Sequence, residues 1–292
     1  MSRKNSKTLS FRSSKPPTQF KVSKKMTLNF TKMNGAGNDF VVIDNRALDK
    51  NLSREQIARL CDRHRGVGAD GLLAVEPAES GADVKFRYYN ADGGEAEMCG
   101  NGARCFGRFT ARLLGGDMTS LTFETIAGTL KAKLIGHEVR IEMSDPIDLE
   151  LHSPVESVAP VHNLNTGVPH AVVFVGDLEN SDIVKNGAAI RYHKHYSPNG
   201  TNANFVGILT PNHLSVRTYE RGVEGETLAC GTGITACALI HHLLTGVSSP
   251  IKIDVRGGET LSIGFEPGPN QTFTRVTLSG PADFVFDGEI EV

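Results

Sequence analysis

The sequence lacks any apolar run close to the ~20 residues that a membrane-spanning helix needs, which argues against a membrane protein. It has no Cys-x-x-Cys pair, and His193 and His195 lie in a polar stretch away from any cysteine pair, so a zinc site is improbable. No lysine lies in a context that demands pyridoxal phosphate, and we expect no cofactor and no metal. Five cysteines in 292 residues, without an apolar export segment, favour free thiols in a reducing compartment, the cytoplasm.

Acidic residues are absent from positions 1–25, which carry eight Lys or Arg, six Ser and a Pro16-Pro17 pair. Subtracting these eight charges from the formal −2 leaves about −10 on the remainder. This composition predicts a basic, disordered N-terminal extension. An organelle transit segment has a similar composition, so the plastid stroma stays open as a location. The acidic remainder argues against a nucleic-acid partner.

Several segments recur at one offset along the chain. The segments Cys99-Gly100-Asn101-Gly102 and Cys230-Gly231-Thr232-Gly233 lie 131 residues apart. Each follows a glutamate by four positions (Glu95 and Glu226) and precedes an apolar, helix-like run. Another pair of segments keeps the same offset: Asn34-Gly35-Ala36 and Asn165-Thr166-Gly167. We therefore predict an internal duplication, with the extension at 1–25, a first domain at 26–147 and a second at 148–292.

Strand patterns outnumber helical patterns in both halves. Alternating or short apolar runs predict strands, among them 28–32, 40–44, 72–75, 84–89, 171–175, 204–208 and 214–219. Helices are expected from Ser53 to Cys61, after Cys99 as far as Gly115-Gly116, and after Cys230 as far as Gly246. Each half is therefore predicted to be α+β, with a curved sheet around one main helix.

Cys-Gly-x-Gly at the start of a helix is suited to binding an anion. The glycines allow backbone amides to approach a ligand closely, and the unpaired N–H groups and the helix dipole attract a carboxylate or phosphate. The same position is expected to lower the pKa of the cysteine. If two such helix starts converge, one thiolate could remove an α-proton while the opposite thiol supplies another, which inverts the carbon. The duplicated motif favours this role for Cys99 and Cys230 over buried structural cysteines. Cys61, Cys105 and Cys237 lack this surrounding and are expected to be core thiols.

Taken together, several segments resemble the diaminopimelate epimerase family from about residue 26 to the C-terminus. They are Asn34-Gly35-Ala36-Gly37-Asn38-Asp39-Phe40, Asn90-Ala91-Asp92-Gly93, Met98-Cys99-Gly100-Asn101-Gly102-Ala103-Arg104-Cys105, Tyr219-Glu220-Arg221-Gly222 and Ala229-Cys230-Gly231-Thr232-Gly233. The resemblance implies an isomerase that interconverts LL- and meso-2,6-diaminopimelate without a cofactor, in lysine and peptidoglycan-precursor biosynthesis. It also implies two pseudo-symmetric, barrel-like domains, each around a central helix, and a homodimer.

The resemblance also implies roles for individual residues. Cys99 would be the proton donor and Cys230 the acceptor, with the roles exchanged in the reverse direction. His170 and Glu220 would tune the two thiols. The substrate contacts would be Asn38, Asn90, Gly100, Asn101, Asn165, Asn202, Glu220, Arg221, Gly231 and Thr232. Asn199 and Asn204 lie close to Asn202 in sequence, so a shift of register would put one of them in its place.

The sequence departs from the family pattern in two places. Many members have a glutamine at the position of Gly71, where it contacts substrate, so we expect that side-chain contact to be missing here. Val168 stands in Asn165-Thr166-Gly167-Val168-Pro169-His170, where Asn-x-Gly-Asn-Pro-His is commoner.

Three alternative functions remain open at this level. A proline or hydroxyproline racemase of the same superfamily would share the two-cysteine chemistry, although the asparagines and the Glu220-Arg221 pair favour a longer substrate with two charged ends. A thiol-disulfide redox protein would use Cys99 and Cys230 as a reversible disulfide. A catalytically silent binding module would usually have lost one of the cysteines, and both are present.

Overall fold

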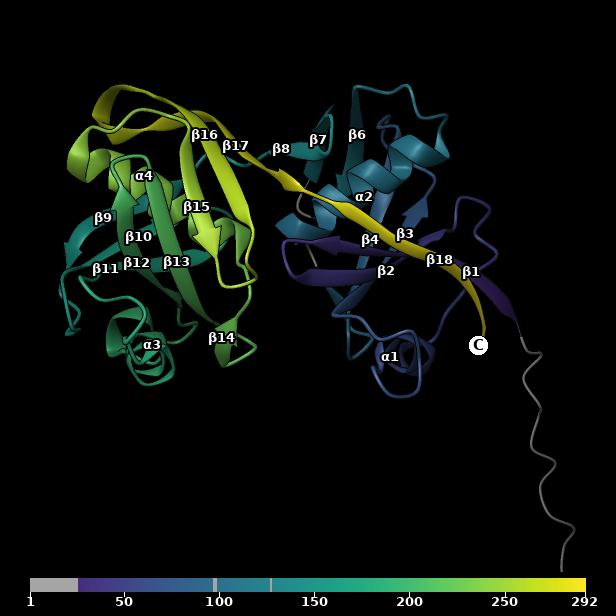
Figure 1. Cartoon of the computed structure of the whole chain (residues 1–292), viewed down its shortest axis with the longest axis horizontal. Coiled ribbons are helices and arrows are strands. Elements are labelled where there is room, and N and C mark those ends of the chain that lie inside the picture. The colour runs from purple at the N-terminus through teal and green to yellow at the C-terminus, as the bar shows by residue number, and fades with distance from the viewer. Residues whose placement is uncertain (1–25, 97–98, 127) are drawn as a thin grey trace, which may run out of the picture.

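The structure, a computed structural model, describes residues 26–96, 99–126 and 128–292, so the extension predicted for 1–25 lies outside the described residues. Two halves lie side by side and are joined by a short strand pair (Figure 1). Within the described residues, each half contains nine strands, one long central helix and one shorter outer helix. In the described part of the chain, no helix has the length and apolar character needed to cross a membrane.

The first half is a curved sheet with the strand order β18-β1-β2-β3-β4-β6-β7-β8, and β5 lies beside β4. The pair β2–β3 is parallel and the other sequential pairs are antiparallel, except for β4–β6. The strands are β1 (Thr27–Gly35), β2 (Asn38–Asp44), β3 (Gly71–Glu76), β4 (Val84–Asn90), β5 (Glu95–Ala96), β6 (Ser120–Thr125), β7 (Gly128–Ile135), β8 (Glu138–Glu142) and β18 (Asp283–Glu291).

The second half repeats this arrangement in the order β9-β10-β11-β12-β13-β15-β16-β17, with β14 beside β13 and a parallel β11–β12 pair. Its strands are β9 (Ile147–Ser153), β10 (Val161–Asn165), β11 (Pro169–Phe174), β12 (Asn202–Thr210), β13 (His213–Glu220), β14 (Gly225–Thr227), β15 (Ile251–Val255), β16 (Thr260–Pro267) and β17 (Phe273–Pro281). The matching strand orders and the structural neighbours described below confirm the α+β fold class.

The helices are α1 (Arg54–Cys61), α2 (Gly100–Leu113), α3 (Ile183–Arg191) and α4 (Gly231–Thr245), with short 3-10 turns η1 (Lys194–Tyr196) and η2 (Pro269–Gln271). Helix α1 begins where predicted, because Ser53 and Gln56 form a capping box. Helix α4 ends at Gly246, which adopts the left-handed conformation with φ 74°. Outer helix α3, which is capped by Asp182, was not predicted. Its position is nevertheless equivalent to that of α1 in the repeat, because the two helices are related by the offset of 131 residues.

The parallel strands are apolar on both faces because a helix covers each face. Along β2, Phe40 and Val42 join the main core around α2, whereas Val41 and Ile43 pack with Ile57 and its neighbours in α1. The second half divides its parallel strands between α4 and α3 in the same way. One continuous apolar core encloses both central helices.

Two strands cross between the halves. Strand β9 follows β8 into the second half and pairs with β10, while β18 follows β17 back into the first half and pairs with β1. Figure 1 shows β18 lying along β1 of the first half. The boundaries 26–147 and 148–292 stay a prediction, but by its pairing β18 lies in the sheet of the first half.

Candidate active site

The N-termini of helices α2 and α4 meet at the junction of the halves. A Cβ atom added at Gly100 would lie 3.7 Å from Gly231 Cα and 3.2 Å from Leu278 Cδ2, and one added at Gly231 would lie 3.0 Å from the same Leu278 atom. Glycine at both positions leaves room for Leu278 beneath the two closely spaced helix ends. Cys99 and Cys230 are the N-cap residues of these helices, so the structure brings together the two cysteine segments.

The side chain of Asn38 contacts the Cys99 thiol, and that of Asn101 contacts Asn38. Cys99 Sγ lies 3.5 Å from Asn38 Oδ1, and the Gly102 N–H donates to Cys99 Sγ at 3.5 Å. Asn101 Nδ2 donates to Asn38 Oδ1 and to the Ala229 carbonyl, both at 3.4 Å. Through that second bond Asn101 links the two cysteine segments across the junction.

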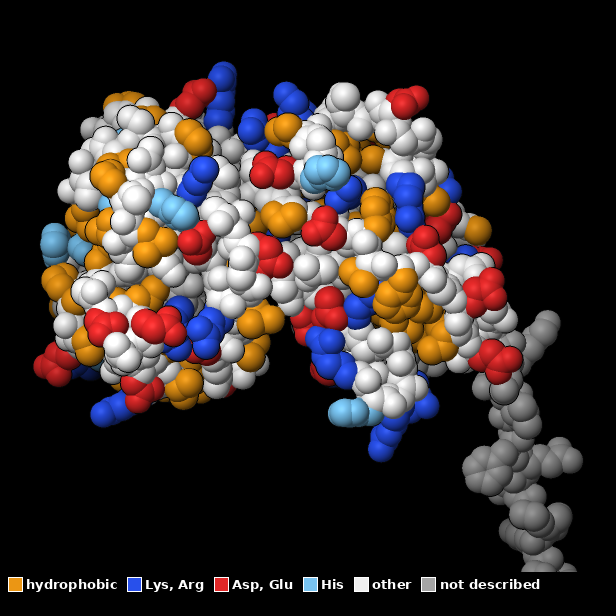
Figure 2. All heavy atoms as spheres, viewed as in Figure 1, with side chains coloured by type: hydrophobic (Ala, Val, Ile, Leu, Met, Phe, Trp, Pro, Cys, Tyr) orange, Lys and Arg blue, Asp and Glu red, His pale blue; other side chains and the backbone are white. Residues whose placement is uncertain are grey.

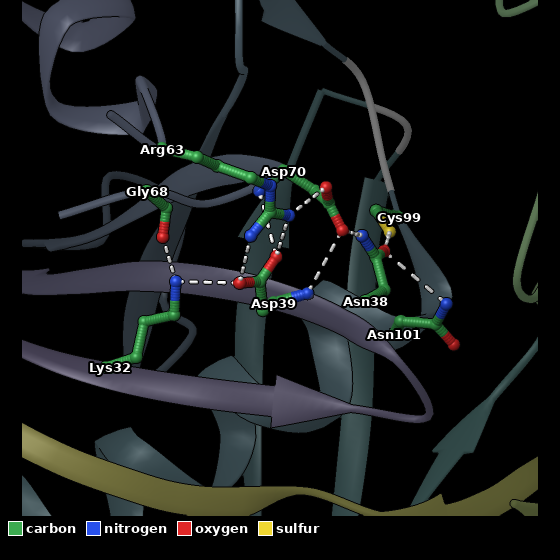
Figure 3. A network of polar contacts seen from close by, with 8 residues as sticks. All are labelled: Lys32, Asn38, Asp39, Arg63, Gly68, Asp70, Cys99 and Asn101. Carbon is green, nitrogen blue, oxygen red and sulfur yellow. Dashed lines mark hydrogen bonds and ion pairs between the residues drawn. The ribbon is translucent and has the colours of Figure 1, made fainter. Parts of the chain in front are cut away.

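Behind Asn38 lies a network of charged side chains (Figure 3). Asp70 accepts from Asn38 Nδ2 at 2.7 Å and from the Arg63 guanidinium at 2.8 Å. Asp39 accepts two bonds from Arg63, at 2.7 and 3.0 Å, and pairs with Lys32 at 2.7 Å. These cations hold the pKa of Asp39 well below its usual range, although burial acts in the opposite direction. The network is a fixed, ionised support for Asn38.

The Cys230 thiol has a different neighbourhood. Thr232 Oγ1 lies 3.6 Å from Cys230 Sγ and 2.9 Å from His170 Nε2. His170 Nδ1 lies 3.2 Å from Asn204 Nδ2. Burial, with a contribution from the charge of Arg221, lowers the pKa of His170 to about 3, so its ring is neutral at physiological pH.

The predicted lowering of the two thiol pKa values is wrong for this arrangement. Burial raises the pKa of Cys99 above its ordinary value and raises that of Cys230 to about 12. The Gly102 N–H at Cys99 and the Thr232 hydroxyl at Cys230 act in the opposite direction but are outweighed. Sequence position reveals a helix N-terminus but not how completely the folded chain excludes water from it.

Glu220, Arg221 and Asn202 lie together next to this centre. Burial raises the pKa of the Glu220 carboxyl, and its charge acts on both thiols. Asn202 Oδ1 accepts from the Arg221 backbone N–H at 2.8 Å, and Asn202 Nδ2 donates to the Pro169 carbonyl at 3.1 Å. Arg221 Nη1 donates to the Gly200 carbonyl at 3.4 Å. Asn202 therefore positions the start of the Arg221 turn.

The other two predicted asparagines form local contacts. Asn165 Oδ1 accepts from the Gly167 N–H at 3.1 Å, which is a turn-forming bond. Asn90 is exposed, and its Oδ1 accepts from the Tyr88 hydroxyl at 2.7 Å.

The structure explains why a glycine stands at position 71. A Cβ atom there would lie 2.5 Å from the Tyr89 carbonyl oxygen and 2.7 Å from Tyr88 Cε2. The Tyr88 ring thus occupies the space that a side chain at 71 would need. Tyr88 was not among the predicted site residues, and the departure at Gly71 was the one signal in the sequence that pointed to it.

The duplicated glutamates have a structural role. Glu95 pairs with Arg87 at 2.5 Å, and Glu226 pairs with Arg217 through bonds of 2.7 and 2.8 Å. These pairs tie the short strands β5 and β14 to β4 and β13 just before each cysteine. Their recurrence at the same spacing reflects the duplicated backbone and not a direct contact with the thiols.

Arg104 is a fully buried cation directly behind the Cys99 segment. Its guanidinium donates to Asn101 Oδ1 at 3.0 Å, to the Pro281 carbonyl at 3.2 Å and to the Gly100 carbonyl at 3.4 Å. These three acceptors are uncharged. Arg104 therefore places positive charge beneath the meeting point of the two helix N-termini.

The remaining cysteines lie away from this centre. Cys61, Cys105 and Cys237 are free thiols buried in the apolar cores, as predicted. Within the described ranges, His, Cys, Asp and Glu form no group of three or more that could hold a metal ion.

A groove in the described part of the chain lies apart from the two cysteines. It has a volume of about 820 Å³ and is lined by Lys131, Arg140, Thr277 and Ser279, among others. Neighbouring residues of a strand face opposite sides, and Leu278, between two of these residues, packs under Gly100 and Gly231. The groove therefore lies on the other face of the β8–β17 pair from the thiols. On the side of α1, α3 and β14, the surface is hollowed between the two halves (Figures 1 and 2).

Comparisons with solved structures show the fold. The chain matches a phenazine biosynthesis protein of the PhzF family from Bacillus anthracis with a TM-score of 0.67 and 17% identity, covering 91% of this chain and 99% of that one. A probable proline racemase from Agrobacterium radiobacter gives a TM-score of 0.66 at 17% identity, covering 91% and 92%.

Comparisons of sequence show the family. The sequence model of the family described as "Diaminopimelate epimerase" matches residues 30–147 and 162–284. A relative of that name from Chlorobaculum tepidum is 44% identical over 263 residues, covering 88% of this chain and 99% of the relative. Another from Aquifex aeolicus is 42% identical over 279 residues, covering 90% and 98%. The chain therefore belongs to the diaminopimelate epimerase family.

Proposed function

We propose that this chain epimerises LL-2,6-diaminopimelate to the meso form with Cys230 and Cys99 as the two acid-base groups at one α-carbon. Membership of the family makes the chain an isomerase that acts on a small molecule in lysine biosynthesis. The observation that carries the proposed mechanism is the meeting of two cysteine-capped helix N-termini at Gly100 and Gly231.

The helix ends are suited to the carboxylate of the reacting centre. The first N–H groups of α2 and α4 have no partner within their own helices, and both helix dipoles point their positive ends at the junction. Buried Arg104 adds a full positive charge behind them. A carboxylate held by the amides of Gly100-Asn101 and Gly231-Thr232 would place its α-carbon between the two thiols.

Inversion then follows from one proton transfer at each face. The Cys230 thiolate takes the α-proton and becomes a thiol, and the electron pair left on the carbon is stabilised through the adjacent carboxylate by the helix amides. The Cys99 thiol delivers its proton to the opposite face and becomes a thiolate. Burial raises the pKa of both thiols, which makes each thiolate a stronger base toward a weakly acidic C–H bond.

The far end of the substrate is assigned to the neighbouring polar groups. Arg221 offers a planar guanidinium for the distal carboxylate, and Glu220 an acceptor for an ammonium group. Asn38, Asn90, Asn165 and Asn202 supply further amides. His170 lies behind Thr232 and acts on Cys230 through it.

Deuterium exchange tests this function directly. With fresh reductant and no added cofactor, NMR in D₂O should show deuterium entering one α-carbon of LL-diaminopimelate while the meso isomer forms. Cys99→Ala and Cys230→Ala should abolish inversion, whereas the matched variant Cys105→Ala, which changes a buried core thiol, should retain it. Exchange into proline or hydroxyproline, with diaminopimelate inert, would instead identify a racemase.

Four further points belong to the proposal. We assign the enzyme to the cytoplasm, in keeping with its free cysteines. We expect a homodimer, which light scattering after size-exclusion chromatography would measure. Neither nucleic acid nor membrane is expected as a partner. The two domains are proposed to begin at residues 26 and 148, with the final strand shared as described above.

A further inference from the structure

The orientation of the amides around Cys99 is fixed by charged groups at both ends. Asp70 accepts hydrogen bonds from Arg63 and from the Asp39 N–H, so the group of Asn38 that faces it must be Nδ2 (Figure 3). The opposite atom, Asn38 Oδ1, is therefore turned toward Cys99 Sγ, 3.5 Å away.

Arg104 fixes the other amide in the same sense. A guanidinium can only donate, so the atom of Asn101 that lies 3.0 Å from Arg104 must be Oδ1. Asn101 Nδ2 then donates to Asn38 Oδ1 and to the Ala229 carbonyl. Both assignments agree, and the Asn38 side chain presents a hydrogen-bond acceptor to Cys99.

The side chain that faces Cys230 is a hydrogen-bond donor, whereas the one that faces Cys99 is an acceptor. The Ala171 carbonyl can only accept, so the Asn204 atom 3.0 Å from it must be Nδ2, and the same amide group faces His170 Nδ1 at 3.2 Å. A neutral His170 with an accepting Nδ1 carries its proton on Nε2 and donates to Thr232 Oγ1 at 2.9 Å. The Thr232 hydroxyl proton is then free to be donated to Cys230 Sγ, 3.6 Å away.

We propose that Asp70 and Asn204, which contact neither thiol, are positioning residues that give the two thiols opposite side-chain hydrogen-bond partners: an acceptor at Cys99 and a donor at Cys230. Each thiol also has a backbone N–H donor, from Gly102 at Cys99 and from Gly233 at Cys230, so these backbone bonds do not distinguish the two thiols. An acceptor stabilises the S–H form and a donor stabilises the thiolate. In the resting enzyme Cys99 is therefore the acid and Cys230 the base. This inference rests on the two-thiol function proposed above and explains how two equivalent cysteines of a duplicated chain become unequal.

The duplication makes the inequality visible in the sequence. Asn101 of the first segment corresponds to Thr232 of the second, and Leu73 corresponds to Asn204, each at the offset of 131. The backbone around the two thiols is thus repeated, whereas the side chains that set their hydrogen bonds are not.

Charged groups that face the thiols act alongside these hydrogen bonds. Glu220, from β13, disfavours the thiolate at both cysteines, and each thiolate disfavours the other, so neither effect distinguishes them. Arg104, from α2, favours a thiolate at Cys99, and burial raises the pKa of Cys230 to about 12, so both effects work against the proposed order. The side-chain hydrogen-bond partners must outweigh both effects, and the order of titration tests whether they do.

The test is a titration of the individual thiols by NMR. The enzyme is labelled with ¹³C at the cysteine Cβ, and each signal is assigned by replacing that cysteine with serine. The Cys230 signal should titrate at a lower pH than the Cys99 signal. Asp70→Leu removes the acceptor that orients Asn38, and should lower the Cys99 midpoint by about one pH unit, a tenfold change in the thiolate fraction. Asp44→Leu, which changes an exposed carboxylate paired with Arg46, is the matched control and should leave both midpoints in place.

A second variant tests the same inference for Cys99 in case the Asp70 variant does not fold. Asn38→Ala removes the acceptor itself and should also lower the Cys99 midpoint. A Cys230 midpoint equal to or above that of Cys99 in the wild type, or an unchanged Cys99 midpoint in folded Asp70→Leu, would overturn the assignment of Asp70.

The role of Asn204 at Cys230 can also be tested in the wild-type enzyme, from the position of the proton on the His170 ring. Long-range ¹H–¹⁵N spectra should show the His170 ring protonated at Nε2, and a proton on Nδ1 would refute the role of Asn204. Asn204→Leu should raise the Cys230 midpoint by about one pH unit. Thr232→Val should do the same because it lacks the donor, whereas Thr232→Ser keeps the hydroxyl and should retain the wild-type midpoint.

These titrations are independent of the substrate. If the enzyme fails to exchange deuterium into diaminopimelate while the thiols titrate as expected, the proposed function is wrong and the assignment of positioning residues stands. If exchange occurs but the midpoints do not respond, the function stands and the positioning inference is wrong.

Discussion

Replacing His170 with glutamine should make the enzyme less sensitive to mild acid. His170 is buried, and its pKa falls from the ordinary 6.5 to about 3. Below pH 6.5 the unfolded chain therefore binds a proton at this residue that the folded chain does not take up. The contribution of neutral His170 to stability is fully present above pH 6.5 and declines as the pH falls toward 3.

The size of this effect follows from the two pKa values. Between pH 7 and pH 5, protonation of His170 in the unfolded chain should lower the free energy of unfolding by about 2 kcal/mol. Glutamine does not titrate, and its amide can still donate to Thr232. The free energy of unfolding of the variant should therefore lack the pH dependence that His170 causes. All other groups titrate in both proteins, so their effects cancel in the comparison.

Urea denaturation of wild type and His170→Gln at pH 7 and pH 5, followed by circular dichroism, measures the difference. The two free energies of unfolding should change between these pH values by amounts that differ by about 2 kcal/mol. His64→Gln, at an exposed histidine, is the matched control. Parallel changes in wild type and His170→Gln would mean that His170 is not held neutral by burial, and the argument for a neutral donor to Thr232 would fail with it.

Three other substitutions test separate parts of the site. Gly233→Ala would place a Cβ atom 2.3 Å from Asn204 Oδ1, so kcat/KM should fall about 100-fold, whereas Gly176→Ala, which meets nothing within 4 Å, should be neutral. Arg104→Met leaves buried acceptors such as Asn101 Oδ1 without their donor, and urea denaturation should show a loss of about 3 kcal/mol in the free energy of unfolding; a loss below 1 kcal/mol would contradict that accounting. Arg221→Lys should raise KM for diaminopimelate about tenfold with a smaller change in kcat, because an ammonium cannot form the two-pronged contact; an unchanged KM would remove Arg221 from the substrate site.

The repeat in the sequence predicted more of the fold than the local patterns did. The offset between Cys99 and Cys230 implied two similar halves, and it also relates α1 to α3, which has no strong local signal of its own. Strand β18 could not be predicted in its place, because its partner β1 lies at the other end of the chain. Local propensity carries no information about a pairing between chain ends.

The site was predictable to the extent that it depends on backbone. Glycines and cysteines at the two helix starts indicated the centre, and the structure places them together. The raised pKa values of the thiols depend on burial, which arises only when both halves close over the same point. The hydrogen bonds of Asn204 and Asp70 depend on which way a side chain turns, and spacing along the sequence does not specify that.

The exchange of strands β9 and β18 between the halves has a consequence for biosynthesis. The first half cannot complete its sheet until residues 283–291 have been made, because β18 supplies the neighbour of β1 and is translated after the other strands that the structure describes. Until β18 leaves the ribosome, β1 therefore has an open edge, the kind of surface that pairs with other chains. A chaperone or rapid release of the finished chain would matter most in that interval, and a chain cut short before residue 283 would expose the same edge permanently.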